Sequence, residues 1–245
     1  MVVMMHSQIC QASADRTFFI GGAMLVFSTP LAPSEKKIFG SGWKTATYTS
    51  AEGDKFKLFP LEELVQTGGV IFGDSLRIRI SSTGKYATID MLEAGIIDPG
   101  PSGKPGVQSR QYCPILETKT GCIVSKQSGG LCAGQWGGQG DRWVVPGVMD
   151  DASNEMLKYQ FKDANTLWEW YINTIGKPFR LSILEEVSSS LGIYNLMACD
   201  HPGVDNIESY KNIASELKKS GDAVGSEYIM KRLRDVAVQR ERSGL

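Results

Sequence analysis

The chain has 245 residues, of which 42% are hydrophobic and 22% are charged, a composition that is ordinary for a globular protein with a buried core. Its 26 basic and 27 acidic residues give a formal net charge of −1, which argues against nucleic acid and against an anionic membrane as partners. Only two histidines, His6 and His201, are present, and this scarcity restricts both metal sites and acid–base catalysis. Since no dinucleotide, phosphate-loop or zinc motif occurs either, we expect no cofactor and no metal.

Residues 1–32 contain an apolar run, Thr17–Ser28, that has two interpretations. The run has the length of a signal-peptide core, about 7–15 residues, and a basic residue precedes it. Alternatively it is a β-hairpin in which Gly21-Gly22 forms the two-residue turn. A membrane span needs about 20 apolar residues, so we expect no stable membrane insertion. The signal interpretation makes the protein periplasmic or secreted, whereas the hairpin interpretation leaves a cytoplasmic location open.

Residues 33–150 are predicted to be β-rich, because apolar and polar residues alternate along several short runs. The expected strands are Trp43–Thr49, Lys55–Phe59, Gly69–Phe72, Leu76–Ile80 and Tyr86–Leu92. In the run Leu76–Ile80 three aliphatic side chains face one way, while Arg77 and Arg79 face the other. We expect these two arginines to form a solvated face.

The residues Cys113–Gly147, here called the Cys/Gly segment, contain three of the five cysteines and two of the five tryptophans. A glycine-rich loop loses much conformational entropy on ordering, so we expect a disulfide and a packed tryptophan to hold it. The disulfide candidates are Cys113, Cys122, Cys132 and Cys199, an even number that suits an oxidising compartment and allows three pairings. The alternative is that all four are reduced, buried side chains.

Residues 151–245 are predicted to be helical. An apolar stripe with steps of three and four begins near Ser153 and ends at Ile175, and Ser182-Ile-Leu-Glu185 reads as a capping box that opens a second helix. Two further helices are expected to start near Asp205 and Ala223. We therefore predict an α+β fold, in which a β-rich N-terminal part with an antiparallel sheet is followed by a C-terminal group of about four helices.

Our first functional hypothesis is a non-enzymatic, exported binding protein that has another protein as its partner. Gln135, Trp136, Gln139, Arg142 and Trp143 offer aromatic surface, amide hydrogen bonds and one guanidinium on a loop, and tryptophan and arginine dominate interface energetics. An inhibitor or immunity-type protein that occludes its partner fits a chain without a catalytic motif. The alternative for the two tryptophans is that they fill the core between the sheet and the helices.

The second functional hypothesis is a cysteine hydrolase, a peptidase or an amidase. Cys132 would be the nucleophile, His201 its base, and Asp205 or the following asparagine would orient the imidazole. The order Gln127, Cys132, Trp136 resembles that of the papain-like peptidases over this one short segment. The spacing differs from theirs, and the tryptophan does not directly follow the cysteine.

Overall fold

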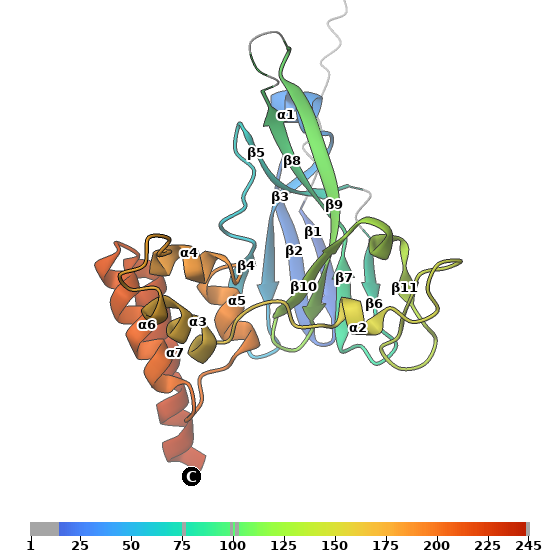
Figure 1. Cartoon of the computed structure of the whole chain (residues 1–245). Coiled ribbons are helices and arrows are strands. Elements are labelled where there is room, and N and C mark those ends of the chain that lie inside the picture. The colour runs from blue at the N-terminus through green and yellow to red at the C-terminus, as the bar shows by residue number, and fades with distance from the viewer. Residues whose placement is uncertain (1–14, 75–76, 99, 101–102, 244–245) are drawn as a thin grey trace, which may run out of the picture.

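The computed structural model describes residues 15–74, 77–98, 100 and 103–243, without the side chains of residues 239–243. A strongly bent antiparallel sheet occupies the N-terminal part, and most helices gather at one side of it (Figure 1). The predicted α+β class is confirmed. The strands are β1 Arg16–Ile20, β2 Ala23–Pro30, β3 Gly42–Thr49, β4 Lys55–Leu58, β5 Gly68–Gly73, β6 Ile78–Ile80, β7 Tyr86–Ile89, β8 Met91–Ile97, β9 Gly106–Glu117, β10 Ile123–Ser128, β11 Gln135–Trp136 and β12 Trp143–Val144. The helices are α1 Pro33–Phe39, the 3₁₀ turn η1 Gly129–Ala133, α2 Ser153–Met156, α3 Ala164–Asn173, α4 Ile183–Ser188, α5 Ile193–Cys199, α6 Ile207–Lys219 and α7 Ala223–Ser243.

The N-terminal apolar run forms the β1–β2 hairpin. Gly21 and Gly22 make the turn with φ angles of 56° and 85°, and positive φ at both central residues is what a type I′ hairpin turn requires. Ile20 and Ala23 pair on either side of the turn and are buried. The run is therefore part of the sheet. The portion of the signal-segment prediction that falls on residues 1–14 lies outside the described residues.

The sheet bends where its long strands, β3 and β9, pair with different neighbouring strands along their length. β9 pairs with β7 and β8 along one edge and with β10 along the other. β3 pairs with β2 along one edge and with β4 and β5 along the other. The predicted hairpin of strands 76–80 and 86–92 appears as β6 and β7, while Leu76 lies outside the described residues.

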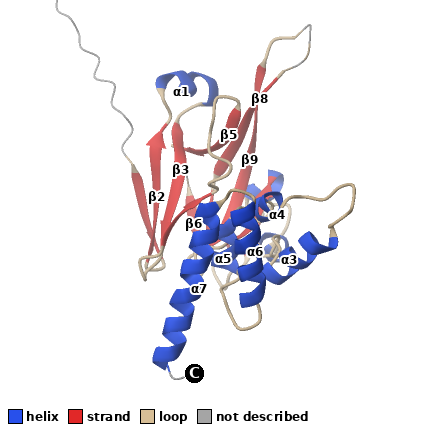
Figure 2. Ribbon diagram, turned by 90° about the vertical axis from the view of Figure 1, so that its left-hand side faces the viewer, coloured by secondary structure: helices blue, strands red, loops and turns tan. Residues whose placement is uncertain are grey.

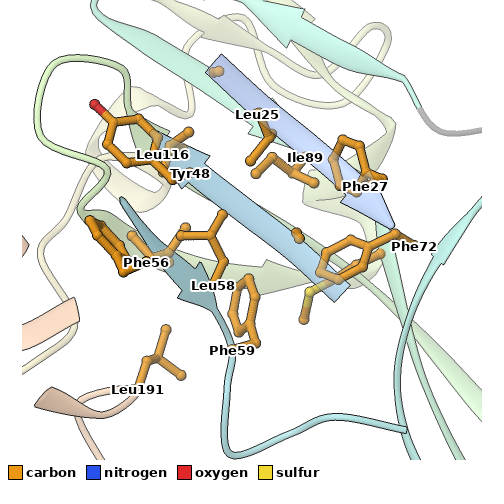
Figure 3. Close-up of a cluster of buried hydrophobic side chains, with 14 of the residues drawn as sticks. Leu25, Phe27, Tyr48, Phe56, Leu58, Phe59, Phe72, Ile89, Leu116 and Leu191 are labelled. Atoms are coloured by element: carbon orange, nitrogen blue, oxygen red, sulfur yellow. The ribbon is translucent and has the colours of Figure 1, made fainter. Parts of the chain in front are cut away.

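The largest hydrophobic core lies inside the bend of the sheet (Figure 3). Leu25 and Phe27 enter it from β2, Tyr48 from β3, and Phe56 and Leu58 from β4. Each large apolar side chain of this kind contributes roughly 1.5–3 kcal/mol when it is fully buried. Phe72, Ile89 and Leu116 complete the core from the other strands, and Leu191 reaches it from the helical group.

The helical part begins at Ser153, as predicted, but it is divided into more helices than the four expected. The stripe expected to form one helix from Ser153 is split between α2, which has four residues, and α3. A new helix begins at α3 because Asp163 caps it, its carboxylate accepting a hydrogen bond from the Thr166 amide at 2.7 Å. The predicted capping box at Ser182 is confirmed at the start of α4. Among the described residues, no helix combines the length and apolarity that crossing a membrane requires.

A covalent joint connects the sheet to the helical group. Cys122, just before β10, forms a disulfide with Cys199 at the end of α5, with their Cα atoms 4.7 Å apart. Beside it the buried Asn195 side chain accepts a hydrogen bond from the Ile123 amide at 2.7 Å. We call this bond the joint disulfide. It fixes α5 against the sheet independently of the packing around it.

Candidate binding site

The Cys/Gly segment starts inside the sheet and ends outside it. Its first part is β9 and β10, after which η1 follows and β11 pairs with β12 as a small ribbon. Cys113 of β9 forms a disulfide with Cys132 of η1, with their Cα atoms 5.4 Å apart. We call this bond the segment disulfide. Figure 1 places β11 and its following loop at the side of the sheet away from the helical group. The predicted disulfide bonding of all four cysteines is confirmed.

Arg79 of β6 holds the segment against the sheet. Its guanidinium donates to the carbonyl oxygen of Cys132 at 3.0 Å and to that of Gly134, and it forms an ion pair with Asp90. It also lies 4.9 Å from the centre of the Trp143 ring. A guanidinium can serve all these partners because it presents several donors in a rigid plane. One side chain thus fixes two backbone positions of the segment and one of its tryptophans.

The prediction that Arg79 belongs to a solvated face is wrong, whereas Arg77 is exposed. Only 20% of the Arg79 side chain is accessible, because the segment covers it. Burial lowers the pKa of Arg79 and raises the pKa of Asp90, and the opposite charge of each partner opposes the shift. The pair therefore depends on both members being present, since either one alone would be a largely buried charge.

The two tryptophans of the segment, Trp136 and Trp143, pack against each other on its inner side. Trp143 is fully buried and donates its indole N–H to the Leu131 carbonyl at 2.9 Å. Trp136 meets it edge to face with 5.0 Å between ring centres and stacks on Tyr86 at 6.2 Å. A Cβ atom at Gly134 would lie 2.2 Å from the Trp143 indole nitrogen, so only glycine fits there. The predicted binding role of Trp143 is therefore corrected: it fills a core between the sheet and the Cys/Gly segment.

Trp136, also predicted to bind, is packed against Trp143 and Tyr86, and the other three predicted binding residues lie on the outside of the segment. Gln135, Gln139 and Arg142 are exposed, and Val148, just beyond the segment, is 81% exposed. We call these four residues the rim. The Arg142 guanidinium lies 3.4 Å from the Asp151 carboxylate, and both side chains are about half exposed. The rim therefore presents amide, guanidinium and aliphatic groups on a backbone that the core beneath it holds in place.

The residues proposed for a cysteine hydrolase are not brought together. Cys132 is bonded to Cys113, and a disulfide sulfur is not the thiolate that nucleophilic catalysis needs. His201 follows α5 in the helical group, beyond the joint disulfide. Among the described residues, no hydrogen bond joins the Asp205 side chain to His201. This correction leaves the hydrolase hypothesis without a nucleophile and without an oriented base.

His201 instead borders a cavity of about 240 Å³ between the β3–β4 turn and helices α5 and α7. Arg232 and Asp54 form an ion pair of 2.6 Å in this cavity. His201 is exposed at the edge of this cavity, where partial desolvation, and then the positive charge of Arg232, lower its pKa, although nearby carboxylates oppose the shift. Within the described ranges, no three His, Cys, Asp or Glu side chains are grouped so that they could hold a metal ion.

The role of Arg79 and Asp90 could not be found from the sequence. Alternation in β6 places Arg79 correctly on the polar face, but its partners are carbonyl groups 53 and 55 residues further along the chain. Backbone carbonyls carry no residue-type signal, so a buried arginine and a solvated one look alike in the sequence.

No protein-family model, no curated protein and no solved structure matches this chain. Function is therefore inferred from the site itself.

Proposed function

We propose that this protein is a non-enzymatic binding protein that recognises another protein through the rim. The observation that carries the proposal is the contrast between the two sides of the Cys/Gly segment. Its inner side is fixed by the segment disulfide, by Arg79 and by Trp143, while its outer side exposes the rim. A loop that is already ordered loses little entropy on binding, and loops held by a rigid scaffold are where recognition residues concentrate.

The proposed compartment is the periplasm or the extracellular space. Two disulfides, the segment disulfide and the joint disulfide, are typical of an oxidising, extracytoplasmic environment. This support does not depend on the N-terminal apolar run, which belongs to the β1–β2 hairpin.

The chemistry of the rim favours a protein partner with an acidic surface group. Arg142 is paired with Asp151 only at the surface, where solvent screening makes such a pair weak. Arg142 can therefore turn to a carboxylate of the partner at little cost, while Gln135 and Gln139 satisfy exposed peptide groups and Val148 adds apolar contact. Within this proposal the protein is an inhibitor or immunity-type protein, which occludes a site on its partner.

Site-specific photocross-linking in the producing cell tests the proposal. A photoreactive residue at Gln139 should give one discrete adduct, and the same residue at Lys37 of α1, which is also exposed, should not. The additional change Arg142→Glu should reduce the adduct at Gln139. The purified partner should then lose its activity as the protein is added up to equal amounts. Equal adducts at the two positions, or none at Gln139, would contradict the proposal.

A further inference from the structure

A protruding apolar loop joins α3 to α4. This α3–α4 loop, residues 174–182, projects from the helical group (Figure 2). Phe179 is 91% exposed, Ile175 is 58% exposed and Leu181 is 44% exposed. Single exposed apolar residues are common on protein surfaces, but an almost fully exposed phenylalanine between two exposed aliphatic residues is a typical interface anchor.

An apolar groove lies on the same helical group. It has a volume of about 480 Å³ and runs between the β4–β5 connection, helix α4 and the first turn of α7; we call it the α4–α7 groove. Leu61, Leu184 and Val224 line it and are 62%, 38% and 68% exposed, while Val187 and Ile193 are buried at its floor. This volume lies within the range of about 300–1,000 Å³ of apolar sites that enclose a ligand, and it can accept a phenyl ring.

The loop and the groove carry opposite charges. Lys177 and Arg180 are exposed on the loop; Arg180 donates to the Tyr171 hydroxyl of α3, whereas among the described residues no carboxylate pairs with Lys177. Glu185 and Asp222 border the groove, where each is held at the start of a helix by a hydrogen bond to a backbone amide. The hydrogen bonds from Ser182 lower the pKa of Glu185, which keeps its carboxylate ionised. A basic, apolar loop thus complements an acidic, apolar groove.

The loop of one molecule does not fill its own groove. Phe179 is nearly fully exposed, and only three residues separate it from Ile183, the first residue of the helix that forms one wall of the groove. We propose that the protein associates with a second copy of itself, the α3–α4 loop of each copy lying in the α4–α7 groove of the other. Because every copy carries both surfaces, a two-fold axis satisfies two such contacts at once.

Sedimentation velocity of the full chain over a concentration series tests this proposal. We expect the wild-type protein to change from monomer to dimer as its concentration rises. Phe179→Ser and Val224→Asp should each weaken dimerisation by about thirtyfold or more, because each removes both symmetric contacts. Both positions are exposed, so circular dichroism should show an unchanged fold. Phe19→Ser is the matched control, since Phe19 is 79% exposed on β1 and belongs to neither surface.

A mixture of the two variants distinguishes this contact from other modes of association. Phe179→Ser keeps an intact groove and Val224→Asp keeps an intact loop, so an equimolar mixture should regain a 1:1 dimer through one remaining contact. A wild-type protein that stays monomeric, a control variant as weak as Phe179→Ser, or a mixture that stays monomeric would each overturn the proposal. Monomeric protein that binds phosphatidylglycerol vesicles through Phe179 would also overturn it, in favour of a lipid surface. The rim shares no residue with the α3–α4 loop or the α4–α7 groove, so the cross-linking result at Gln139 and the dimerisation result can fail independently of each other.

Discussion

Replacing Arg79 by methionine removes the side chain that holds the Cys/Gly segment. The change leaves the carbonyl oxygens of Cys132 and Gly134 without their donor, and it leaves the partly buried Asp90 without its counter-ion. Methionine keeps much of the length and apolar contact of the arginine stem, so the loss is mainly electrostatic. Arg77→Met is the matched control, because Arg77 is the neighbouring arginine of the same strand run and is exposed.

We expect Arg79→Met to lower the free energy of unfolding by about 3 kcal/mol. Breaking a buried ion pair from one side costs about 3–5 kcal/mol, and the lower end applies because about a fifth of each side chain is accessible. For a chain of this size that corresponds to a fall in melting temperature of roughly 6–12 °C. Arg77→Met should change stability by no more than about 0.5 kcal/mol.

The pH dependence of this loss identifies Asp90 as its source. Burial raises the pKa of Asp90 in the folded protein, and removing Arg79 removes the charge that opposes this shift. A carboxyl group whose pKa is raised on folding does not destabilise the fold below its unfolded pKa of about 4. Its penalty grows as the pH rises from that value to the folded pKa, and above the folded pKa it stays at its full size. The deficit of Arg79→Met should therefore be smaller at acidic pH than at neutral pH.

Urea unfolding followed by tryptophan fluorescence measures these differences. Arg79→Met combined with Asp90→Asn should recover about 1–2 kcal/mol relative to Arg79→Met alone, because the unpaired charge is gone. A variant that is as stable as Arg77→Met, or a deficit that is the same at every pH, would refute the role assigned to the Arg79–Asp90 pair.

Three other changes test the rest of the fold. Replacing the two cysteines of the segment disulfide by serine should lower the free energy of unfolding by up to about 3 kcal/mol in chemical denaturation, because the bond closes a loop with a sequence separation of 19. The same change at the joint disulfide, with a sequence separation of 77, should lower it by up to about 4.5 kcal/mol. Gly134→Ala should cost about 1–3 kcal/mol by displacing Trp143, whereas Gly138→Ala, with open space around it, should be close to neutral in the same assay. Deleting residues 1–32 removes β1, β2 and their buried side chains, so the truncated chain should show no cooperative melting transition, and a well-folded truncated chain would contradict this placement.

Local signals in the sequence predict most of the strands and helix starts. The Gly21-Gly22 turn and the capping box at Ser182 both appear in the structure, because each is satisfied by residues within a few positions along the chain. The prediction of one helix over the apolar stripe from Ser153 to Ile175 is wrong, because a periodic pattern alone does not show that a new helix begins after Asp163. Propensity and periodicity describe neighbours in the chain and do not reveal the break between α2 and α3.

The candidate site was less accessible to sequence reasoning than the fold. The participation of four cysteines in disulfides was predicted, but their pairing depends on which strands meet, and this is a property of the whole sheet. The same limit applies to Trp143, which looks like a binding residue on a glycine-rich loop but is fully buried. Only long-range packing separates such a buried tryptophan from exposed neighbours such as Gln139.

The chemical state of Cys132 is the most direct test of the view that the Cys/Gly segment is a fixed recognition surface. Alkylation of the native, unreduced protein followed by peptide mapping should find Cys132 unlabelled and linked to Cys113, and Cys122 linked to Cys199. A free Cys132 thiol that is alkylated rapidly at neutral pH would contradict this account, and it would restore the cysteine nucleophile that the structure removes.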